Sequence, residues 1–307
     1  MKKSLRLITA MAAIIAYAAS MWAQPTTQEC AQAWRNAGTD TCARRTALEQ
    51  WQRIAPADDA DLAMAECEYY RSLAATTDVV RTSGVMPIDT TDFHVVAIDS
   101  VAHRSMLTPG TYDSRIMGKA IAALQRGIAA NPDRLDLHTT LMASLADAGK
   151  FSDAVAEIHT TLNRDSAEHR QWTRSGGAPV SHPADAIAQG VAYTASRMIN
   201  ASDANAPTVI ATCRAALKRC PHNATMLRPL ESTLMLTEDY QGAIEVQQQL
   251  LALSPGDCQV LSDAAMAYMA TGQTAKAAQC CRKVKTGGDA EQRQWATEML
   301  NMILGGF

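Results

Sequence analysis

Residues 224–257 read ATMLRPLESTLMLTEDYQGAIEVQQQLLALSPGD, and residues 258–291 read CQVLSDAAMAYMATGQTAKAAQCCRKVKTGGDAE. The two stretches carry apolar residues at the same four positions, namely Leu227, Leu230, Leu234 and Ala243 in the first and Leu261, Ala264, Tyr268 and Ala277 in the second. Pro221 and Pro255, which each close a helix, lie 34 residues apart. A helical period of this length predicts helix pairs that stack into a solenoid, because no single pair buries its own apolar face.

A third copy of the pattern lies upstream, in residues 135–168. Its equivalent positions hold Leu141, Leu145, Gly149, Ala154 and Ile158. Gly149 and, in the last copy, Gly272 fall at the turn between the two helices, where the residue after the helix end takes a left-handed conformation. The alanine of each copy, here Ala154, falls where the two helices cross most closely. With these residues the chain resembles the tetratricopeptide repeat (TPR) family, which implies an all-α solenoid that binds or scaffolds.

The repeats predict an all-α, TPR-like α-solenoid of about five helix pairs with two irregular insertions and a C-terminal capping helix. We expect six segments in this order: a signal peptide in 1–23, a degenerate N-terminal helical unit in 24–75, an irregular connection in 76–112, TPR-like helices in 113–164, an insertion in 165–183, and TPR-like repeats with the capping helix in 184–307. Trp34 and Trp51 are expected in the core, because aromatic side chains bury large apolar areas. A β-favouring run from Val95 to Ile98 lies in the connection, and a helix over Gly288–Leu304 would cover the last apolar face.

Residues 1–23 have the composition of a secretory signal peptide. Three basic residues precede an apolar stretch from Leu7 to Ala19, which is shorter than the roughly 20 apolar residues of a membrane-spanning helix. Cleavage after Ala23 is expected, and cleavage after Ala18 is the alternative. We therefore expect an exported chain, periplasmic or secreted, that is soluble once the leader is removed.

The charge and the cysteines give no sign of a nucleic-acid or metal site. The formal net charge is −3, and removal of the leader with its three basic residues changes it to −6. A mildly acidic chain without a basic stripe does not indicate binding to nucleic acid or anionic lipid. Among the eight cysteines, Cys213 and Cys220 lie on one helical face, too far apart for a disulfide. No C-x-x-C pair occurs, so buried free thiols or one or two disulfides are expected and a zinc site is not.

The residue types of an enzyme do not form a recognisable set in this sequence. The seven histidines are dispersed, and only His138 and His159 could face one another across a repeat. The G-x-S-x-G, H-E-x-x-H and phosphate-loop motifs are absent. We therefore expect no catalytic residue, no cofactor and no metal. The enzymatic alternative is a site beneath the insertions 76–112 and 165–183, where titratable groups would converge.

The first helices of stacked repeats line a concave groove that accepts an extended peptide or a helix. The family resemblance implies that eight residues face this groove: Thr225, Arg228, Ser232, Met235, Gln259, Ser262, Met266 and Met269. Chaperone-binding members of the family hold a carboxylate with a lysine and an asparagine, but the corresponding positions here hold Arg228 with Ser232 and Ser262 with Met266. The groove would instead present a mostly neutral, Met-containing stripe, unless these methionines pack between repeats. Pro229 either delays the start of its helix, with Arg228 as the cap, or distorts the groove face.

These observations predict a non-enzymatic exported scaffold that binds a protein or peptide partner through its concave groove. The order of the segments resembles exported TPR proteins of the Bacteroidetes, and Asn131–Leu137 and Thr286–Leu300 carry that resemblance. The alternative, from a different class, is a structural subunit of an envelope assembly that uses its convex face. A groove binder predicts an unoccupied apolar concavity, whereas a structural subunit predicts a large flat apolar patch elsewhere.

Overall fold

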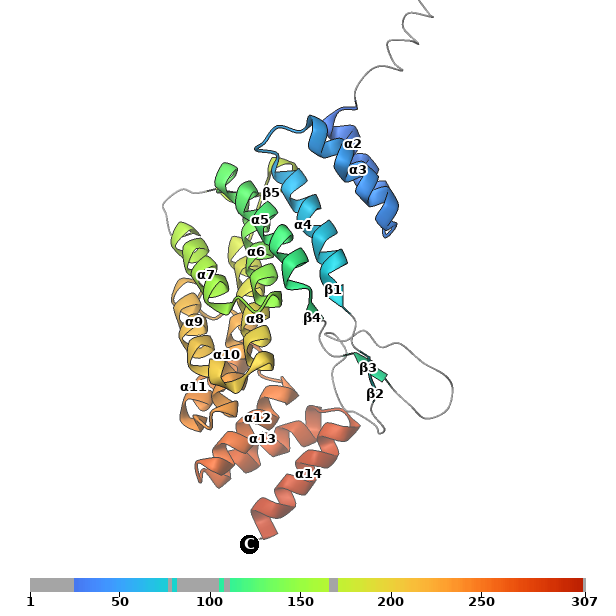
Figure 1. Ribbon diagram of the computed structural model, residues 1–307. Coiled ribbons are helices and arrows are strands. Elements are labelled where there is room, and N and C mark those ends of the chain that lie inside the picture. Colours follow the sequence, from blue (N-terminus) through green and yellow to red (C-terminus); the bar gives the residue numbers. More distant parts are fainter. Residues whose placement is uncertain (1–24, 77–78, 82–104, 108–110, 166–170, 306–307) are drawn as a thin grey trace, which may run out of the picture.

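The computed structural model describes residues 25–76, 79–81, 105–107, 111–165 and 171–305, and α-helices dominate them (Figure 1). Thirteen α-helices occur within these described residues: α2 (Thr27–Asn36), α3 (Thr41–Ile54), α4 (Ala60–Ala74), α5 (Ser114–Ala130), α6 (Leu135–Asp147), α7 (Phe151–Asp165), α8 (Pro183–Ala201), α9 (Ala206–Arg219), α10 (Ala224–Leu236), α11 (Tyr240–Leu253), α12 (Cys258–Ala270), α13 (Thr274–Gly287) and α14 (Ala290–Gly305). The all-α class predicted from the sequence is confirmed.

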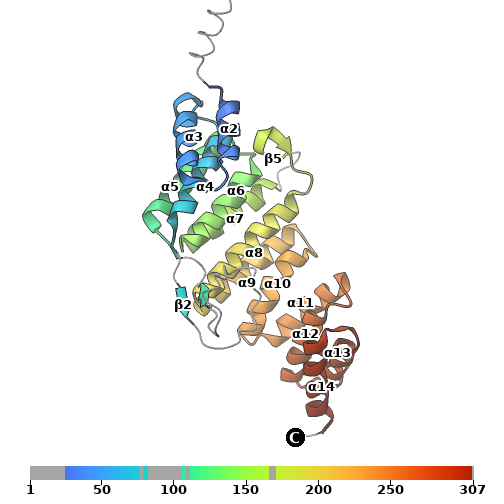
Figure 2. The same cartoon turned by 90° about the vertical axis from the view of Figure 1, so that its right-hand side faces the viewer.

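The helices pack as successive pairs, and α14 follows the last of them. The pairs are α2 with α3, α4 with α5, α6 with α7, α8 with α9, α10 with α11, and α12 with α13. Where the sequence predicts about five pairs, the described residues form six, because α4 pairs with α5 across the long connection between them. Figure 2 shows the first helices α6, α8, α10 and α12 following one another along the solenoid, from α2 and α3 at one end to α14 at the other.

The 34-residue period is confirmed by the spacing of the helices. The second helices α9, α11 and α13 begin at Ala206, Tyr240 and Thr274 and each is 14 residues long. Ala154, Ala243 and Ala277 are all 0% exposed, as residues at a close crossing of two helices would be. A larger side chain at these positions would push the two helices of a pair apart.

The turn between the two helices of a repeat takes the expected left-handed conformation. Gly149 has φ 70° and Gly272 has φ 74°. At the same position of the intermediate repeat stands Glu238, which keeps the conformation with φ 59°. Its backbone N–H donates to the carbonyl of Met235 as the N–H of Gly272 donates to Met269. The repeat therefore imposes this backbone conformation even on a residue that disfavours it.

Short antiparallel strands occur in the two irregular segments. The strands pair as β1 (Ala75–Thr76) with β4 (Thr111–Tyr112), β2 (Val79–Arg81) with β3 (Ser105–Leu107), and β5 (Thr173–Arg174) with β6 (Ala178–Pro179). The connection that carries β1 to β4 leaves α4 and returns to α5, so it is an insertion within one helix pair. The β-favouring run from Val95 to Ile98 lies outside the described residues.

The N-terminal helices form their own apolar cluster around two tryptophans. Trp34 of α2 and Trp51 of α3 are buried together with Tyr69 of α4, as the sequence predicts for these core anchors. The Trp51 indole N–H donates to Asp59 Oδ2 at 2.9 Å, which satisfies its one polar atom. The predicted leader, residues 1–23, lies outside the described residues. Among the helices that the structure describes, none is long and apolar enough to cross a membrane.

The helix α10 begins early in spite of its proline. It starts at Ala224, with the Asn223 side chain accepting from the N–H of Met226, and Pro229 lies inside it. The interpretation in which the helix starts late with Arg228 as its cap is therefore wrong.

All eight cysteines are free thiols, and six of them are buried. Of the two alternatives that the sequence left open, the structure therefore shows buried free thiols and not disulfides. The expected capping helix is α14, whose Trp295 and Met299 pack on the apolar cluster of α12 and α13.

Candidate functional site

A hollow of about 600 Å³ lies between the first helices α8 and α10. Its lining comes from those two helices: Ala192, Ala195, Ser196, Ile199 and Asn200 from α8, and Ala224, Thr225, Arg228, Pro229, Ser232 and Thr233 from α10. Three of the residues that the sequence predicts for the groove, Thr225, Arg228 and Ser232, are among them. The structure therefore brings this part of the predicted set to one concavity.

The two walls of the hollow differ in character. The α8 wall is made largely of small and apolar side chains, with Ala195 buried and Ile199 half-buried. The α10 wall contains Pro229, which has no N–H to donate to the carbonyl of Thr225 four residues earlier. The Thr225 carbonyl thus loses its helical donor at the edge of the hollow. A small apolar wall facing a carbonyl that receives no N–H from Pro229, and a serine hydroxyl, suits an extended backbone that donates hydrogen bonds.

The positive charge of Arg228 is held by the next repeat. Its Nη2 donates to Asp257 Oδ2 at 2.5 Å, and Asp257 also caps α12 by accepting from the N–H groups of Gln259 and Val260. Burial opposes ionisation of Asp257, but the Val260 N–H and the Arg228 guanidinium together keep the pKa of this carboxyl below its ordinary value. Because Arg228 is already paired, it is not free to receive a peptide carboxylate in the way that a clamp lysine does.

Two further carboxylates lie beside Arg228, and the sequence reading did not single them out. Glu231 of α10 is buried and accepts from Gln247 Nε2 at 2.6 Å, while Asp263 of α12 accepts from Gln259 Nε2 at 3.2 Å. Burial raises the pKa of both carboxyls above the ordinary value. The sequence does contain a sign of this buried carboxylate, because Glu231 stands at the position where the following repeat has the small apolar residue Ala265. These two carboxyls lie near Arg228 but do not belong to the lining of the hollow.

The other five predicted groove residues lie apart from the hollow. Met235 is half-buried between the two largest apolar clusters, and Met269 packs on the cluster of α12 and α13. Ser262 donates to the carbonyl of Cys258 at 2.9 Å, and Gln259 is occupied with Asp263. Met266 is 42% exposed. Two of the three methionines thus fill the space between repeats, and Met266 alone of the three remains an exposed apolar contact.

A buried carboxylate ties together the first helices of three repeats. Asp147, at the end of α6, is fully buried and receives Arg71 Nη2 of α4 at 2.6 Å. From α8 the Tyr193 hydroxyl donates to it at 2.5 Å, and Arg197 Nε forms an ion pair with it at 3.2 Å without a hydrogen bond. Two guanidinium groups and a phenol balance the one carboxylate, which is the condition for burying an ion at acceptable free energy.

The groups around Asp147 are not activated for catalysis. Burial and the neighbouring carboxylate raise the pKa of the Tyr193 hydroxyl, which keeps it a hydrogen-bond donor at neutral pH. Burial also raises the pKa of the nearby Cys67 thiol to about 11, so this thiol is not a ready nucleophile. Titratable groups do converge near the insertion between α4 and α5, and their hydrogen bonds and ion pairs join α4, α6 and α8.

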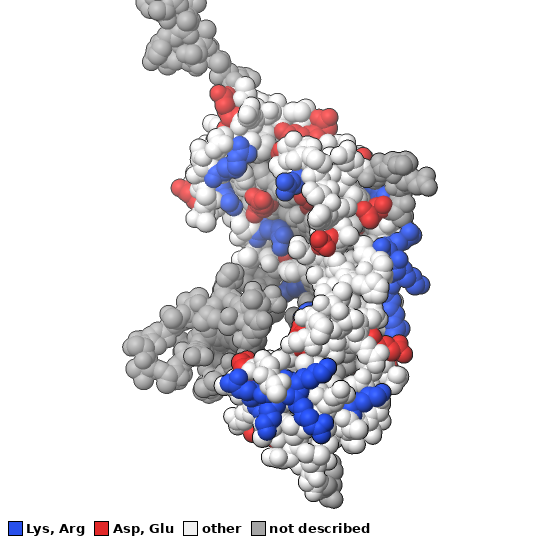
Figure 3. All heavy atoms as spheres, turned by 180° about the vertical axis from the view of Figure 1, so that it is seen from behind, with Lys and Arg blue, Asp and Glu red and all other residues white. Residues whose placement is uncertain are grey.

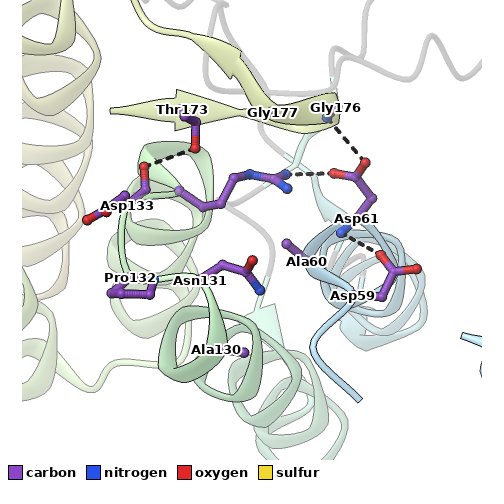
Figure 4. Close-up of a pocket in the computed structure, with 11 residues that line it drawn as sticks. Asp59, Ala60, Asp61, Ala130, Asn131, Pro132, Asp133, Thr173, Gly176 and Gly177 are labelled. Carbon is purple, nitrogen blue, oxygen red and sulfur yellow. Dashed lines mark hydrogen bonds and ion pairs between the residues drawn. The ribbon is translucent and has the colours of Figure 1, made fainter. Parts of the chain in front are cut away.

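A second cleft, of about 480 Å³, lies where the insertion before α8 meets the start of α4 and the loop between α5 and α6 (Figure 4). Arg134 lies behind it and donates to Asp61 Oδ1 at 2.7 Å and to Asp136 Oδ1 at 2.9 Å. The N–H of Gly176 donates to the second oxygen of Asp61, and Thr173 bonds the Asp133 carbonyl. The polar groups of this cleft are engaged in holding the insertion against the repeats.

The insertion is also anchored by a tryptophan. Trp172 is buried, donates its indole N–H to Asp165 Oδ1 at 2.7 Å, and packs edge-on against His138. Both ring nitrogens of His138 face oxygen acceptors, Glu157 Oε1 and the Pro132 carbonyl. His159, which the sequence reading set opposite His138, is exposed, and Glu157 occupies that place instead. Within the described part of the chain no group of three or more His, Cys, Asp or Glu side chains is arranged to hold a metal.

No protein-family model and no curated protein matches this sequence. Among solved structures, the crystal structure of PilW, described as a widely conserved type IV pilus biogenesis factor, is 11% identical, covers 89% of this chain and 99% of its own, and has a TM-score of 0.46. The MamA protein is 15% identical over 59% of this chain and 85% of its own, with a TM-score of 0.39. A thermophilic TPR protein of Thermus thermophilus is 14% identical over 61% and 92%, with a TM-score of 0.37. These likenesses concern the fold, and the TPR fold of this chain rests on its own 34-residue helix spacing.

Proposed function

We propose that this protein is an exported, non-enzymatic TPR scaffold that holds an extended segment of a partner protein in the hollow between α8 and α10. The observation that carries the proposal is the coincidence of that hollow with Thr225, Arg228 and Ser232, which the repeat register predicts to face the groove. A solenoid offers its concave first helices to partners in just this way. Protein–protein interaction is the general role of the scaffold, and use of this groove is the specific proposal.

The chemistry of the hollow indicates what it would hold. Ala192, Ala195 and Ile199 accept small apolar side chains, while the Thr225 carbonyl and the Ser232 hydroxyl bind the backbone of the segment. The neighbouring carboxylates Glu231 and Asp263 disfavour an acidic side chain or a terminal carboxylate at this place. A neutral or basic extended segment is therefore the expected occupant of the groove.

The test is a display screen of random peptides against the immobilised full chain, followed by binding measurements on variants. Ser196→Trp with Ser232→Trp fills the hollow from both walls, and both serines are exposed, so the fold is expected to persist. Gln249→Trp on the exposed face of α11 is the matched control. Peptides that bind the unchanged chain and the control, but lose at least about tenfold in affinity for the filled variant, support the proposal.

Circular dichroism and thermal unfolding of each variant separate loss of binding from loss of structure. If the selected peptides bind the filled variant as tightly as the unchanged chain, the groove is not the binding site. Export is tested separately. The chain is expressed in a bacterial cell with its leader intact, and its size and the compartment in which it is found are measured. Retention of an uncleaved chain in the cytoplasm would contradict export without touching groove binding.

A structural subunit that uses its convex face is the second candidate. The second helices form that face, and their exposed side chains are not constrained by the concave groove. Peptide binding that is insensitive to the filled groove, but sensitive to changes on the second helices, would favour this candidate.

A further inference from the structure

The second helix of the last repeat, α13, has the highest formal positive charge of the helices that the structure describes. Its sequence, TAKAAQCCRKVKTG, contains four basic residues and no acidic residue, a formal charge of +4. Lys276, Arg282, Lys283 and Lys285 are all exposed. Seen from behind, Lys and Arg side chains gather over the C-terminal part of the molecule with little acidic surface among them (Figure 3). The sequence reading, which weighed net charge, missed this basic helix.

The preceding repeat shows that the fold does not require these charges, although α9, one repeat earlier, has Arg214 at the position equivalent to Arg282. The helix α11 has the equivalent positions 34 residues earlier. They hold uncharged residues, namely Gln248, Gln249 and Leu251 in place of Arg282, Lys283 and Lys285. Both helices have the same length, the same alanine at the crossing and the same register. The same backbone therefore exists without the charges, and their presence on α13 needs another explanation.

Helix-terminal electrostatics account for one of the four charges. Lys285 lies in the last turn of α13, where the helix dipole favours a cation. Arg282 and Lys283 lie earlier, and Arg282 repels Lys285 three residues on, which weakens an isolated helix slightly. Among the described residues, no ion pair engages Arg282, Lys283 or Lys285. An uncompensated group of like charges on a rigid helix is prepared to receive a negatively charged partner.

The other exposed residues of α13 decide which anionic partner fits. They are Thr274, Ala275, Gln279, Thr286 and Gly287, and none is a large apolar or aromatic residue. A helix that lies on a membrane needs apolar side chains to enter the lipid, and single-stranded nucleic acid is held by aromatic stacking. Neither kind of side chain is exposed on α13. A short acidic protein segment needs only the cations.

We propose that the exposed face of α13 is a docking surface for an acidic segment of a partner protein, with Arg282, Lys283 and Lys285 as its contacts. Two or more carboxylates of the segment pair with cations that lie within a single turn of the helix. This surface lies on a second helix, so it is distinct from the hollow between α8 and α10. The two surfaces also differ in character, because the hollow is lined mostly by small and neutral side chains and its one cation, Arg228, is paired with Asp257.

The test measures binding of a fluorescein-labelled hexaglutamate peptide to the full chain by fluorescence anisotropy. Arg282→Gln with Lys283→Gln and Lys285→Gln removes the three contacts without changing the packing of α13. Arg214→Gln with Lys218→Gln and Arg219→Gln is the matched control, because it removes three exposed charges from α9. Vesicles containing about 30% phosphatidylglycerol, probed by flotation, form the lipid arm of the experiment.

The expected result is peptide binding that weakens by at least about tenfold in the α13 variant, and that stays within about twofold in the α9 control. Binding is also expected to weaken when the salt concentration rises from about 50 mM to about 300 mM, because exposed ion pairs are screened. An absence of peptide binding, an equal loss in both variants, or vesicle binding that depends on α13 in place of peptide binding would each overturn the proposal.

Discussion

The repeats at 224–257 and 258–291 have the same skeleton and different surfaces. Their helices begin and end in the same register, and their crossing alanines, Ala243 and Ala277, are equally buried. Yet one repeat has Pro229 in its first helix, and the other has four cations on its second helix. The comparison shows that a few apolar and small residues are enough to specify the helix pair, which leaves the remaining positions open to carry a site.

The largest expected effect tests whether the two repeats are equivalent in their cores. Leu227→Ala and Leu261→Ala remove the same side chain from equivalent buried positions. Each is expected to lower the free energy of unfolding by about 3 kcal/mol, because a buried leucine loses both apolar burial and packing. Urea denaturation of both variants measures this loss. Values that differ by more than about 2 kcal/mol would show that the shared register does not produce equivalent packing.

A smaller effect is expected at the turn, and it has opposite signs in the two repeats. Glu238→Gly is expected to stabilise the protein by about 1 kcal/mol, because glycine adopts the left-handed conformation without strain. Gly272→Ala is expected to destabilise it by about 1 kcal/mol, and no atom lies near enough to the new methyl group to add a steric effect. Thermal unfolding compares the two midpoints. If both changes shift the midpoint in the same direction, the turns are not equivalent.

Glu231, whose counterpart in the next repeat is Ala265, is expected to make stability depend on pH. Burial raises its folded-state pKa, so the protonated carboxyl favours the folded state at low pH, and that contribution is lost as the pH rises through the folded-state pKa. Glu231→Gln mimics the protonated form, so its stability relative to the unchanged chain is expected to improve between pH 4 and pH 7, by about 1 kcal/mol or less.

Urea denaturation at both pH values measures this change, and Glu245→Gln on the exposed face of α11 is the control. A relative stability that falls towards pH 7 would mean that the ionised Glu231 stabilises the fold. The Gln247 hydrogen bond would then outweigh the burial of the charge.

The smallest effect on stability is expected from transplanting charges between the repeats. Gln248→Arg with Gln249→Lys places on α11 the cations that α13 has at the equivalent positions. Because both side chains are exposed, the free energy of unfolding is expected to change by no more than about 0.5 kcal/mol. The same variant is expected to bind hexaglutamate more tightly than the unchanged chain, which anisotropy would detect. Unaltered peptide binding would indicate that charge alone does not make the α13 surface.

The fold could be predicted from the sequence because its determinants repeat. The crossing alanines, the turn glycines and the buried leucines recur at a fixed spacing, and each has one dominant physical reason. The pairing of α4 with α5 could not be predicted in this way. The connection between them interrupts the period, so spacing no longer indicates which helices are partners.

The candidate site could be predicted only in part. Thr225, Arg228 and Ser232, which the repeat register assigns to the groove, line a hollow, because backbone geometry decides where they point. It did not reveal that Asp257 neutralises Arg228, since that contact crosses from one repeat to the next. The total charge likewise hid the basic α13, because acidic residues elsewhere in the chain cancel it.

The Asp147 contacts have a mechanical consequence for the solenoid. A stack of repeats bends through small rotations between neighbours, and a side-chain network that spans α4, α6 and α8 stiffens that segment against bending. The Arg228 to Asp257 ion pair couples α10 to α12 in the same way. The hollow lies between these two braced segments, so the elastic response of the molecule is expected to concentrate where α8 meets α10. Pulling the two ends of the solenoid apart is then expected to widen this groove more readily than the joints that the Asp147 and Arg228 contacts span.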